Sequence, residues 1–516
     1  MGLAVRRGAR TALRGFDRPQ KGPVMSISHI PSSTTLVSLN VNQRTYILLD
    51  AAVEVASGTA VEMTATALSS LIVAGRITAT NTVDGAGILA VATSIGTRVS
   101  VTKTGLVESG NVGVWLKGAG QVLENFGHIK VTDTSGHGVA VDGTSNAQVV
   151  NHGAIKGGSA AMSAGVAVST SSQVLVENDG RITGNLGIYG FFSSQIDITN
   201  SGKIVAAGTG VVLSSLVDAG QLHNFGLIRG GENGVHVAAG TSEIVNMGTI
   251  KGGGPMGGGA ILYDSGDNDL TNGGRIVGPV QFDAGADTFH ALPGSTLQGT
   301  LWMGGGNDTV IAAEQDDIVF GEAGNDDITG GGGNDELHGG AGDDTLKGSA
   351  GADKLFGDAG NDLMLGGGGK DRLNGGVGID ILKGEGGADR LNGGDGIDVM
   401  LGGGGKDRLN GGLGDDQLDG GKGNDVLTGS SGSDTFIFNA ADANTGRDRI
   451  TDFLDGVDKI DLTSYAIADY DFFLGAAKSM SHGNTVIDLS AAGAGYSGLI
   501  VLEGVNAAQI TAGDFV

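Results

Sequence analysis

The sequence predicts an all-β fold: an N-terminal parallel β-helix, then a parallel β-roll, then a β-rich C-terminal cap. Two internal repeats carry this prediction. A nine-residue repeat runs without a break in phase over residues 303–437, and a looser repeat of roughly 24 residues runs over residues 25–302. Repeats of fixed period are typical of solenoids, in which each repeat adds a coil or part of one. The 99 glycines and 4% aromatic residues fit a solenoid better than a fold with a large conventional core.

The nine-residue repeat divides residues 303–437 into fifteen units. Position six is Asp and position eight is apolar in all fifteen, and position four is Gly in every unit except the second, which has Gln315. Glycine adopts positive φ without steric cost, so each unit is predicted to form a tight turn followed by a short strand whose position-eight side chain points inward. Two units then make one coil of eighteen residues. A disordered acidic linker would have no reason to keep position eight apolar.

This pattern resembles the Gly-Gly-x-Gly-x-Asp-x-apolar-x repeat of the RTX (hemolysin-type calcium-binding) proteins. The resemblance implies that loops on neighbouring coils, about 4.8 Å apart, share Ca²⁺ ions, which take carboxylate and carbonyl oxygens as ligands. Fifteen loops allow at most thirteen such pairs on the same side. The second unit, AAEQDDIVF, lacks the glycines, so its Asp317 is left out. The predicted ligands are Asp308, Asp326, Asp335, Asp344, Asp353, Asp362, Asp371, Asp380, Asp389, Asp398, Asp407, Asp416, Asp425 and Asp434.

The looser repeat is marked by Asn-x-Gly-x-Ile. It begins at Asn125, Asn151, Asn178, Asn200, Asn224 and Asn246, with a variant at Asn272. Residues 103–107 fit as a degenerate first copy. We expect one β-helix coil per repeat, with the Asn side chains stacked as a ladder; a substrate-binding row of Asn is the alternative. The repeat resembles those of autotransporter-type passenger helices of bacterial surface proteins.

The two ends of the chain differ. Residues 1–24 hold six basic side chains and one acidic, and no apolar region follows Arg6 and Arg7. They are expected to be a disordered leader, or the product of a start assigned too early, with Met25 the true start. Residues 446–453 and 456–462 resemble the C-terminal cap of serralysin-type RTX proteins, which assigns the cap to residues 438–516. The tail 514–516 resembles the uncleaved signal read by type I (ABC transporter) secretion systems, which implies a secreted or surface-associated bacterial protein.

Charge and composition exclude several classes of protein. The net charge is −26, and residues 303–437 hold 26 acidic and 9 basic side chains. This acidity argues against nucleic acid as a partner and fits the binding of cations. The absence of cysteine excludes disulfides and thiolate metal sites. No run of about 18 apolar residues is present, so no transmembrane segment is predicted.

The sequence shows no active site. It contains neither His-Glu-x-x-His nor Gly-x-Ser-x-Gly. Mannuronan C5-epimerases resemble this layout of a β-helix joined to RTX modules, but Tyr189 begins the run YGFFSS, where their catalytic stretch has Asp-Pro-His. We therefore expect a secreted, non-enzymatic calcium-binding protein, acting at the cell surface or in the matrix with a polysaccharide as candidate partner. An extracellular polysaccharide-modifying enzyme, epimerase or lyase, is the main alternative, and a toxin or bacteriocin is the third.

Overall fold

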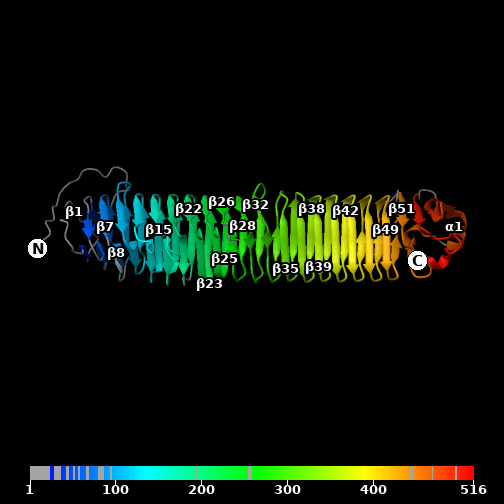
Figure 1. The fold of residues 1–516 in the computed structure, drawn as a ribbon, viewed down its shortest axis with the longest axis horizontal. Coiled ribbons are helices and arrows are strands. Elements are labelled where there is room, and N and C mark those ends of the chain that lie inside the picture. Colours follow the sequence, from blue (N-terminus) through cyan, green and yellow to red (C-terminus); the bar gives the residue numbers. More distant parts are fainter. Residues whose placement is uncertain are drawn as a thin grey trace. The chain divides into compact units, whose positions relative to one another are not determined.

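The computed structural model describes residues 24–27, 37–41, 46–49, 53–55, 59–65, 69–79, 86–92, 96–143, 145–191, 195–253, 258–440, 446–467, 469–493 and 497–516. The basic leader predicted for residues 1–24 lies outside them, apart from Val24. The chain forms two compact units. Unit 1 comprises the residues up to 283 with 295–299, and unit 2 comprises residues 284–294 and 300–516. Each unit is a parallel β-solenoid, which confirms the predicted fold class (Figure 1).

Unit 1 is a β-helix built from three ladders of parallel strands. The first ladder contains β1 (Val24–Ile27), β3 (Tyr46–Leu49), β6 (Ser69–Val73), β9 (Thr97–Val101), β12 (Val122–Asn125), β15 (Ser145–Asn151), β18 (Ser172–Asn178), β21 (Ile196–Asn200), β23 (Val211–Asn224), β25 (Val235–Asn246) and β28 (Asp269–Asn272). The second contains β2 (Val37–Val41), β5 (Val61–Ala65), β8 (Ala86–Ala92), β11 (Val112–Lys117), β14 (His137–Asp142), β17 (Ala164–Ser169), β20 (Leu186–Phe191), the long strands β23 and β25, β27 (Ile261–Tyr263) and β30 (Val280–Gln281).

The third ladder is a separate sheet of eleven strands. It contains β4 (Val53–Val55), β7 (Arg76–Ala79), β10 (Leu106–Ser109), β13 (His128–Val131), β16 (Ala154–Lys156), β19 (Arg181–Gly184), β22 (Lys203–Ala206), β24 (Leu227–Arg229), β26 (Thr249–Lys251), β29 (Arg275–Val277) and β32 (Thr296–Gln298). The Ile of each Asn-x-Gly-x-Ile copy lies on this sheet and is buried to 0–1% exposure, so the repeat places one side chain per coil in the core.

The repeated asparagines form the predicted ladder. Each ends a strand of the first ladder, and its side-chain N–H donates to the carbonyl oxygen of the next Asn side chain. From Asn125 through Asn272 these bonds are 2.7–2.8 Å long. All seven side chains are buried to 2% exposure or less. They are therefore structural, and they cannot serve as an accessible substrate-binding row.

The degenerate first copy is only partly as predicted. Val107 pairs with Ile129, as the alignment of residues 103–107 requires. The residue opposite Asn125, however, is Val101 and not Lys103. The turn after Val101 is two residues longer than its counterpart after Asn125, so a fixed Asn-to-Ile spacing misplaces the ladder position.

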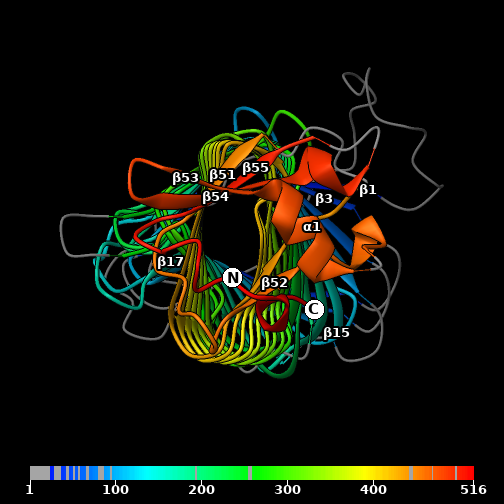
Figure 2. The same cartoon turned by 90° about the vertical axis from the view of Figure 1, so that its right-hand side faces the viewer.

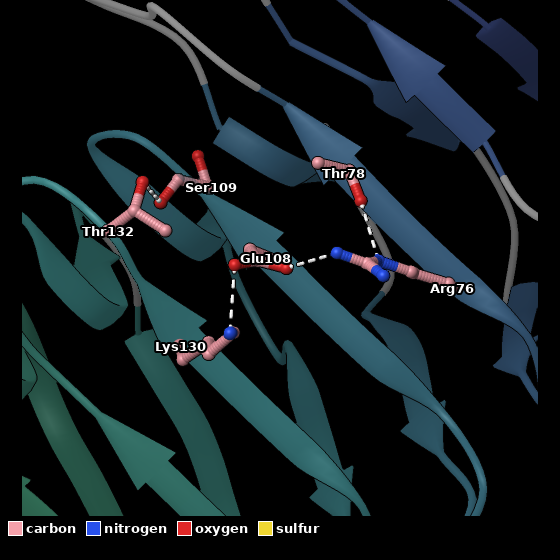
Figure 3. A network of polar contacts seen from close by, with 6 residues as sticks. All are labelled: Arg76, Thr78, Glu108, Ser109, Lys130 and Thr132. Carbon is pink, nitrogen blue, oxygen red and sulfur yellow. Dashed lines mark hydrogen bonds and ion pairs between the residues drawn. The ribbon is translucent and has the colours of Figure 1, made fainter. Parts of the chain in front are cut away.

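Charged side chains cross the outer surface of the eleven-stranded sheet. Glu108 on β10 lies between Arg76 on β7 and Lys130 on β13, with oxygen–nitrogen distances of 2.7 and 2.8 Å (Figure 3). The hydrogen bond from Lys130 and the nearby Arg76 lower the pKa of Glu108 below its ordinary value, despite partial burial. Because both cations are exposed, these pairs fix the register more than they add stability.

Unit 2 is a roll with two ladders, and neighbouring strands of a ladder are eighteen residues apart through the repeat. In Figure 2 the yellow and orange coils of this unit overlie one another. One ladder contains β33 (Leu301–Trp302), β35 (Ile318–Ala323), β37 (Glu336–Ala341), β39 (Lys354–Ala359), β41 (Arg372–Val377), β43 (Arg390–Asp395), β46 (Arg408–Leu413), β49 (Val426–Ser431) and β51 (Arg447–Ile450).

The other ladder of the roll contains β31 (Thr288–Ala291), β34 (Thr309–Ile311), β36 (Asp327–Gly332), β38 (Thr345–Gly351), β40 (Leu363–Gly369), β42 (Ile381–Gly387), β44 (Val399–Leu401), β45 (Gly404–Gly405), β47 (Gln417–Asp419), β48 (Lys422–Gly423), β50 (Thr435–Ile437) and β52 (Lys459–Asp461). All fifteen position-eight side chains are buried to 2% exposure or less, as predicted. They form a narrow core between the two ladders.

The cap closes the roll by extending both ladders. β51 and β52 each add one parallel strand, and an antiparallel sheet of β53 (Lys478–Ser481), β54 (Asn484–Asp488) and β55 (Leu499–Leu502) attaches to β51. The remaining elements are η1 (Thr463–Tyr465), α1 (Tyr470–Ala477), η2 (Leu489–Ala492) and η3 (Ala512–Asp514). Covering the last strands protects edges that could otherwise pair with another chain. No helix in the described part of the chain is long and apolar enough to span a membrane.

Candidate calcium-binding rows

The fourteen predicted ligands form two rows, one along each side of the roll. In each row the peptide N–H of one Asp donates to Oδ1 of the Asp eighteen residues later, at 2.8–3.0 Å. One row runs through Asp308, Asp326, Asp344, Asp362, Asp380, Asp398, Asp416 and Asp434. The other runs through Asp335, Asp353, Asp371, Asp389, Asp407 and Asp425. One carboxylate oxygen is thus used to hold neighbouring coils in register.

The second carboxylate oxygen has no such role. Oδ2 is buried and has no hydrogen-bond partner at thirteen of the fourteen positions, Asp434 being the exception. A buried acceptor without a partner costs about 1–3 kcal/mol, and more when it is charged. Repeated at eighteen-residue intervals along both sides, this cost indicates that a cation is the missing partner.

The position-one glycines leave room beside these oxygens. A Cβ placed on Gly357 would lie 2.2 Å from Asp362 Oδ2 and 2.6 Å from the carbonyl oxygen of Gly375. On Gly393 it would lie at the same distances from Asp398 Oδ2 and the Gly411 carbonyl. A carboxylate from one unit and a carbonyl from the next coil therefore face the same space, which any other residue at position one would fill.

Backbone oxygens must complete any metal site here. No group of three or more His, Cys, Asp or Glu side chains converges among the described residues. Ca²⁺ accepts carbonyl oxygens alongside carboxylates and tolerates irregular geometry, whereas structural Zn²⁺ sites are built from His nitrogen and Cys sulfur ligands, which the Asp rows do not contain. Alternating carboxylates and glycine carbonyls therefore fit calcium. When bound, it would supply the positive charge that the buried Oδ2 atoms lack.

Burial raises the pKa of these carboxyl groups. The pKa is raised to about 7 at Asp308, Asp335, Asp344 and Asp425. It is raised to about 6 at Asp362, Asp371, Asp389, Asp398 and Asp434. Loss of hydration is the largest cause in each case, and the neighbouring carboxylate of the same row adds to it. Without a cation, the rows would therefore compete for protons near neutral pH.

The second unit departs from the pattern, as its missing glycines suggested. Asp317 is buried, but its carboxylate accepts a hydrogen bond from the peptide N–H of Ala313 in its own unit. Position four of this unit is Gln315, which does not adopt the positive φ of the position-four glycines. We therefore keep Asp317 outside the proposed ligand set.

The rows extend beyond the nine-residue repeat. Asp425 N–H donates to Asp448 Oδ1 at 2.9 Å, and Asp434 N–H donates to Asp458 Oδ1 at 3.1 Å. Burial raises the pKa of Asp448 to about 8. The intervals here are 23 and 24 residues, so a fixed nine-residue period misses both. The signal that finds them is Gly-x-Asp-x-apolar, present in residues 446–450 and 456–460.

A further row was not predicted from the sequence, and it is formed by the side chains at position five, next to the position-six aspartates. Asn307 Oδ1 accepts from the peptide N–H of Asn325, and Asn325 Oδ1 accepts from that of Asp343, at 2.9 and 3.0 Å. The row loses its acceptors where Ile379 and Ile397 occupy the position. Frequent Asn and Asp at position five was the sequence signal for it.

Comparison with known families decides the identity of this region. The model of the RTX calcium-binding nonapeptide repeat (4 copies) matches residues 303–337, 329–364, 338–373, 365–400 and 401–436. These residues are RTX repeats. The resemblance seen in the sequence is confirmed for this part of the chain, and RTX repeats as a family bind calcium.

Solved structures with similarity to the chain include three bacterial proteins. The AlgE6R3 subunit of the Azotobacter vinelandii mannuronan C5-epimerase is 31% identical, with 29% of this chain and 78% of that chain covered and a TM-score of 0.22. A hyperactive, Ca²⁺-dependent, β-helical antifreeze protein from an Antarctic bacterium is 19% identical, with 48% and 80% covered and a TM-score of 0.33. The extracellular lipase LipA from Serratia marcescens is 17% identical, with 45% of each chain covered and a TM-score of 0.17. No curated protein sequence matches the chain.

Proposed function

We propose that this is a secreted protein whose RTX roll folds on binding calcium after export through a type I system, and that it acts without catalysis at the cell surface or in the matrix. The observation that carries the proposal is the set of thirteen buried Oδ2 atoms without partners. A fold that buries this much negative charge needs cations to form. Metal binding free energy then becomes folding free energy.

The location of calcium supports the order of events. Extracellular calcium modules have dissociation constants on the order of 10⁻⁴–10⁻³ M. The roll would stay unfolded in the low-calcium cytosol and fold outside. The folded cap also supports export before folding. Asp514 is 2% exposed and Phe515 is 7% exposed, and the backbone of Phe515 forms a parallel β-bridge with Ile460. A signal in this tail is therefore accessible to an exporter only before the cap folds.

A non-catalytic role is supported by the side chains of unit 1. The Asn ladder, a polar row that runs through seven coils, is buried. One histidine near it is engaged in local contacts: His152 Nδ1 lies 2.7 Å from an Asp179 carboxylate oxygen, and its ring stacks on Phe126. Neither feature provides the acid and base pair that an epimerase or lyase needs.

Two measurements test the proposal. A calcium titration of the full chain, followed by far-UV circular dichroism, should show a cooperative gain of β-structure that magnesium does not reproduce. Equal spectra in calcium and in chelator would contradict calcium-driven folding. In cells carrying a type I exporter, a reporter fused to residues 438–516 should leave the cell, whereas one fused to residues 25–302 should stay inside. Export that depends on residues 1–24 instead would contradict the assigned route.

A further inference from the structure

One line of side chains on the roll carries the opposite charge from its surroundings. Arg372, Arg390 and Arg408 occupy position seven on β41, β43 and β46, and each is exposed. They are direct partners in the parallel register, Arg372 with Arg390 and Arg390 with Arg408. We call these three residues the arginine stripe. Neighbouring strands lie about 4.8 Å apart, so the stripe repeats a positive charge at that interval.

The stripe is not part of the calcium machinery. Side chains alternate between the two faces of a strand, so position seven points outward while position eight points into the core. The preceding aspartates, Asp371, Asp389 and Asp407, are buried to 1% exposure or less and bond to their own row. The arginines therefore do not neutralise the buried carboxylates.

Basic residues before and after the stripe, at the register positions that continue it along the ladder, form ion pairs, whereas the three stripe arginines do not. Before the stripe, Lys354 Nζ lies 2.7 Å from Glu336 Oε2. After it, Arg449 Nε donates to Glu503 Oε1 at 2.7 Å. In the described part of the chain, the three stripe arginines have no ion pair. Like charges directly opposite one another destabilise a sheet, so the fold does not account for three of them in sequence.

A ladder of amides lies beside the stripe. Asn392 Nδ2 donates to Asn374 Oδ1 at 2.6 Å, and Asn410 Nδ2 donates to Asn392 Oδ1 at 2.7 Å. These asparagines occupy position nine of the same three strands, so they face the same side as the arginines. In the ladder that carries the stripe, positions seven and nine hold no acidic residue from β39 to β49, and Lys370 and Lys406 add exposed positive charge in the preceding turns. Among β41, β43 and β46 the only acid is Asp395, five residues beyond Arg390 at the end of β43.

We propose that the arginine stripe binds a linear acidic polysaccharide, with the polymer lying along the stack of coils. Guanidinium groups bind carboxylates through paired hydrogen bonds, and amides bind hydroxyl groups. A polyuronate offers both in every sugar ring, and a ring is about as long as the strand spacing. Nucleic acid is disfavoured because the chain around the stripe is strongly acidic, which repels a polymer with denser charge. The inference deepens the proposed surface or matrix role and rests on it.

Binding should be measured with the full chain in excess calcium. The probe is an oligogalacturonate too short to gel, and the control ligand is the same oligomer fully methyl-esterified, which keeps the backbone and removes the charge. We expect calorimetric binding of the acid form alone, weakened by added NaCl. The triple variant R372Q/R390Q/R408Q should lower the affinity about tenfold or more, since it removes three charge-assisted contacts.

A matched variant separates this effect from a general loss of charge. K347Q/K383Q/K422Q removes three cations from the other ladder and its turns and should leave binding within about twofold. The calcium-dependent circular dichroism of the stripe variant should be unchanged, because its arginines repel one another in the fold. No binding by the natural chain, or equal losses in both variants, would overturn the proposal. Tighter binding of a single-stranded DNA oligonucleotide would reassign the stripe to nucleic acid. A missing calcium response would refute the folding proposal independently of the binding result.

Discussion

The peptide N–H of Asp362 donates a 2.9 Å hydrogen bond to Oδ1 of Asp380, while Oδ2 of Asp380 is buried without a partner. The two oxygens of one carboxylate thus have separate roles. Oδ1 sets the register of neighbouring coils, and Oδ2 supplies a charge that requires a cation. Because the arrangement recurs on both sides of the roll, the loss of one charge should affect the coils before and after it.

Replacing Asp380 with Asn should raise the calcium concentration at the folding midpoint by about tenfold, equivalent to about 1.4 kcal/mol. The amide oxygen can still accept the N–H of Asp362, so the register is retained while the charge is lost. The same change at Asp434, whose Oδ2 is not among the orphaned atoms, should have a smaller effect. Calcium titration by circular dichroism measures both. Asp395→Asn, at an exposed position at the end of β43, is the control; an equal shift in the control would show that only net charge matters.

Acid should partly replace calcium. The carboxyl groups have a pKa near 3.9 in an unfolded chain, and burial raises this pKa in the metal-free fold, to about 7 at Asp344 and about 6 at Asp362. Between these values the folded state binds more protons than the unfolded state, so the stability of the metal-free roll rises as the pH falls from about 7 to about 4, and this gain is lost again as the pH rises. In calcium-free buffer we expect more β-structure and a smaller hydrodynamic radius at about pH 4.5 than at about pH 7.5. With calcium bound, lower pH should have the opposite effect, because protons compete with the ion. An equally unfolded chain at both pH values would show that burial of the carboxylates is not what opposes folding.

The sequence predicts the roll well because its constraints are local and periodic. Position-eight burial at Leu346 or Leu382 and the Asp rows follow from turn chemistry repeated in phase. The contributions of Asp448 and Asp458 could not be read from that period, because insertions of five and six residues lie between them and the preceding members of their rows. In unit 1, the place of Val101 in the ladder depends on the length of the turn that follows it, and Val101 itself stands where the later copies have Asn. The arginine stripe required the strand register, since residues eighteen apart become neighbours only when the coils are stacked.

Position two of the nine-residue unit offers a stabilising substitution in the roll. Ser349 holds φ at +80°, where glycine occupies the same place in most units. A non-glycine residue in this region costs roughly 1 kcal/mol, so Ser349→Gly should stabilise the calcium-loaded roll by about 0.5–1 kcal/mol. Thermal unfolding in calcium measures this. The reverse change, Gly367→Ser at φ +103°, should destabilise it; a loss of stability in both variants would mean that the Ser349 side chain makes a contact worth more than the strain.

The Asn ladder should stabilise unit 1 without metal. Asn200 is fully buried; its Oδ1 accepts from Asn178 Nδ2, and its Nδ2 donates to Asn224 Oδ1. Asn200→Ala leaves one buried donor and one buried acceptor unpaired, which should cost about 2–5 kcal/mol in total. In chelator we expect residues 53–299 to retain their β-structure while the roll unfolds. Urea unfolding under these conditions therefore reports on the stability of the β-helix of unit 1 alone. Limited proteolysis in chelator should leave a resistant fragment ending near Trp302. Thr199→Ala, which changes the adjacent partly exposed side chain, should alter stability by less than about 0.5 kcal/mol. If the two variants unfold at the same urea concentration, the ladder is a by-product of the coil geometry and contributes little to its stability.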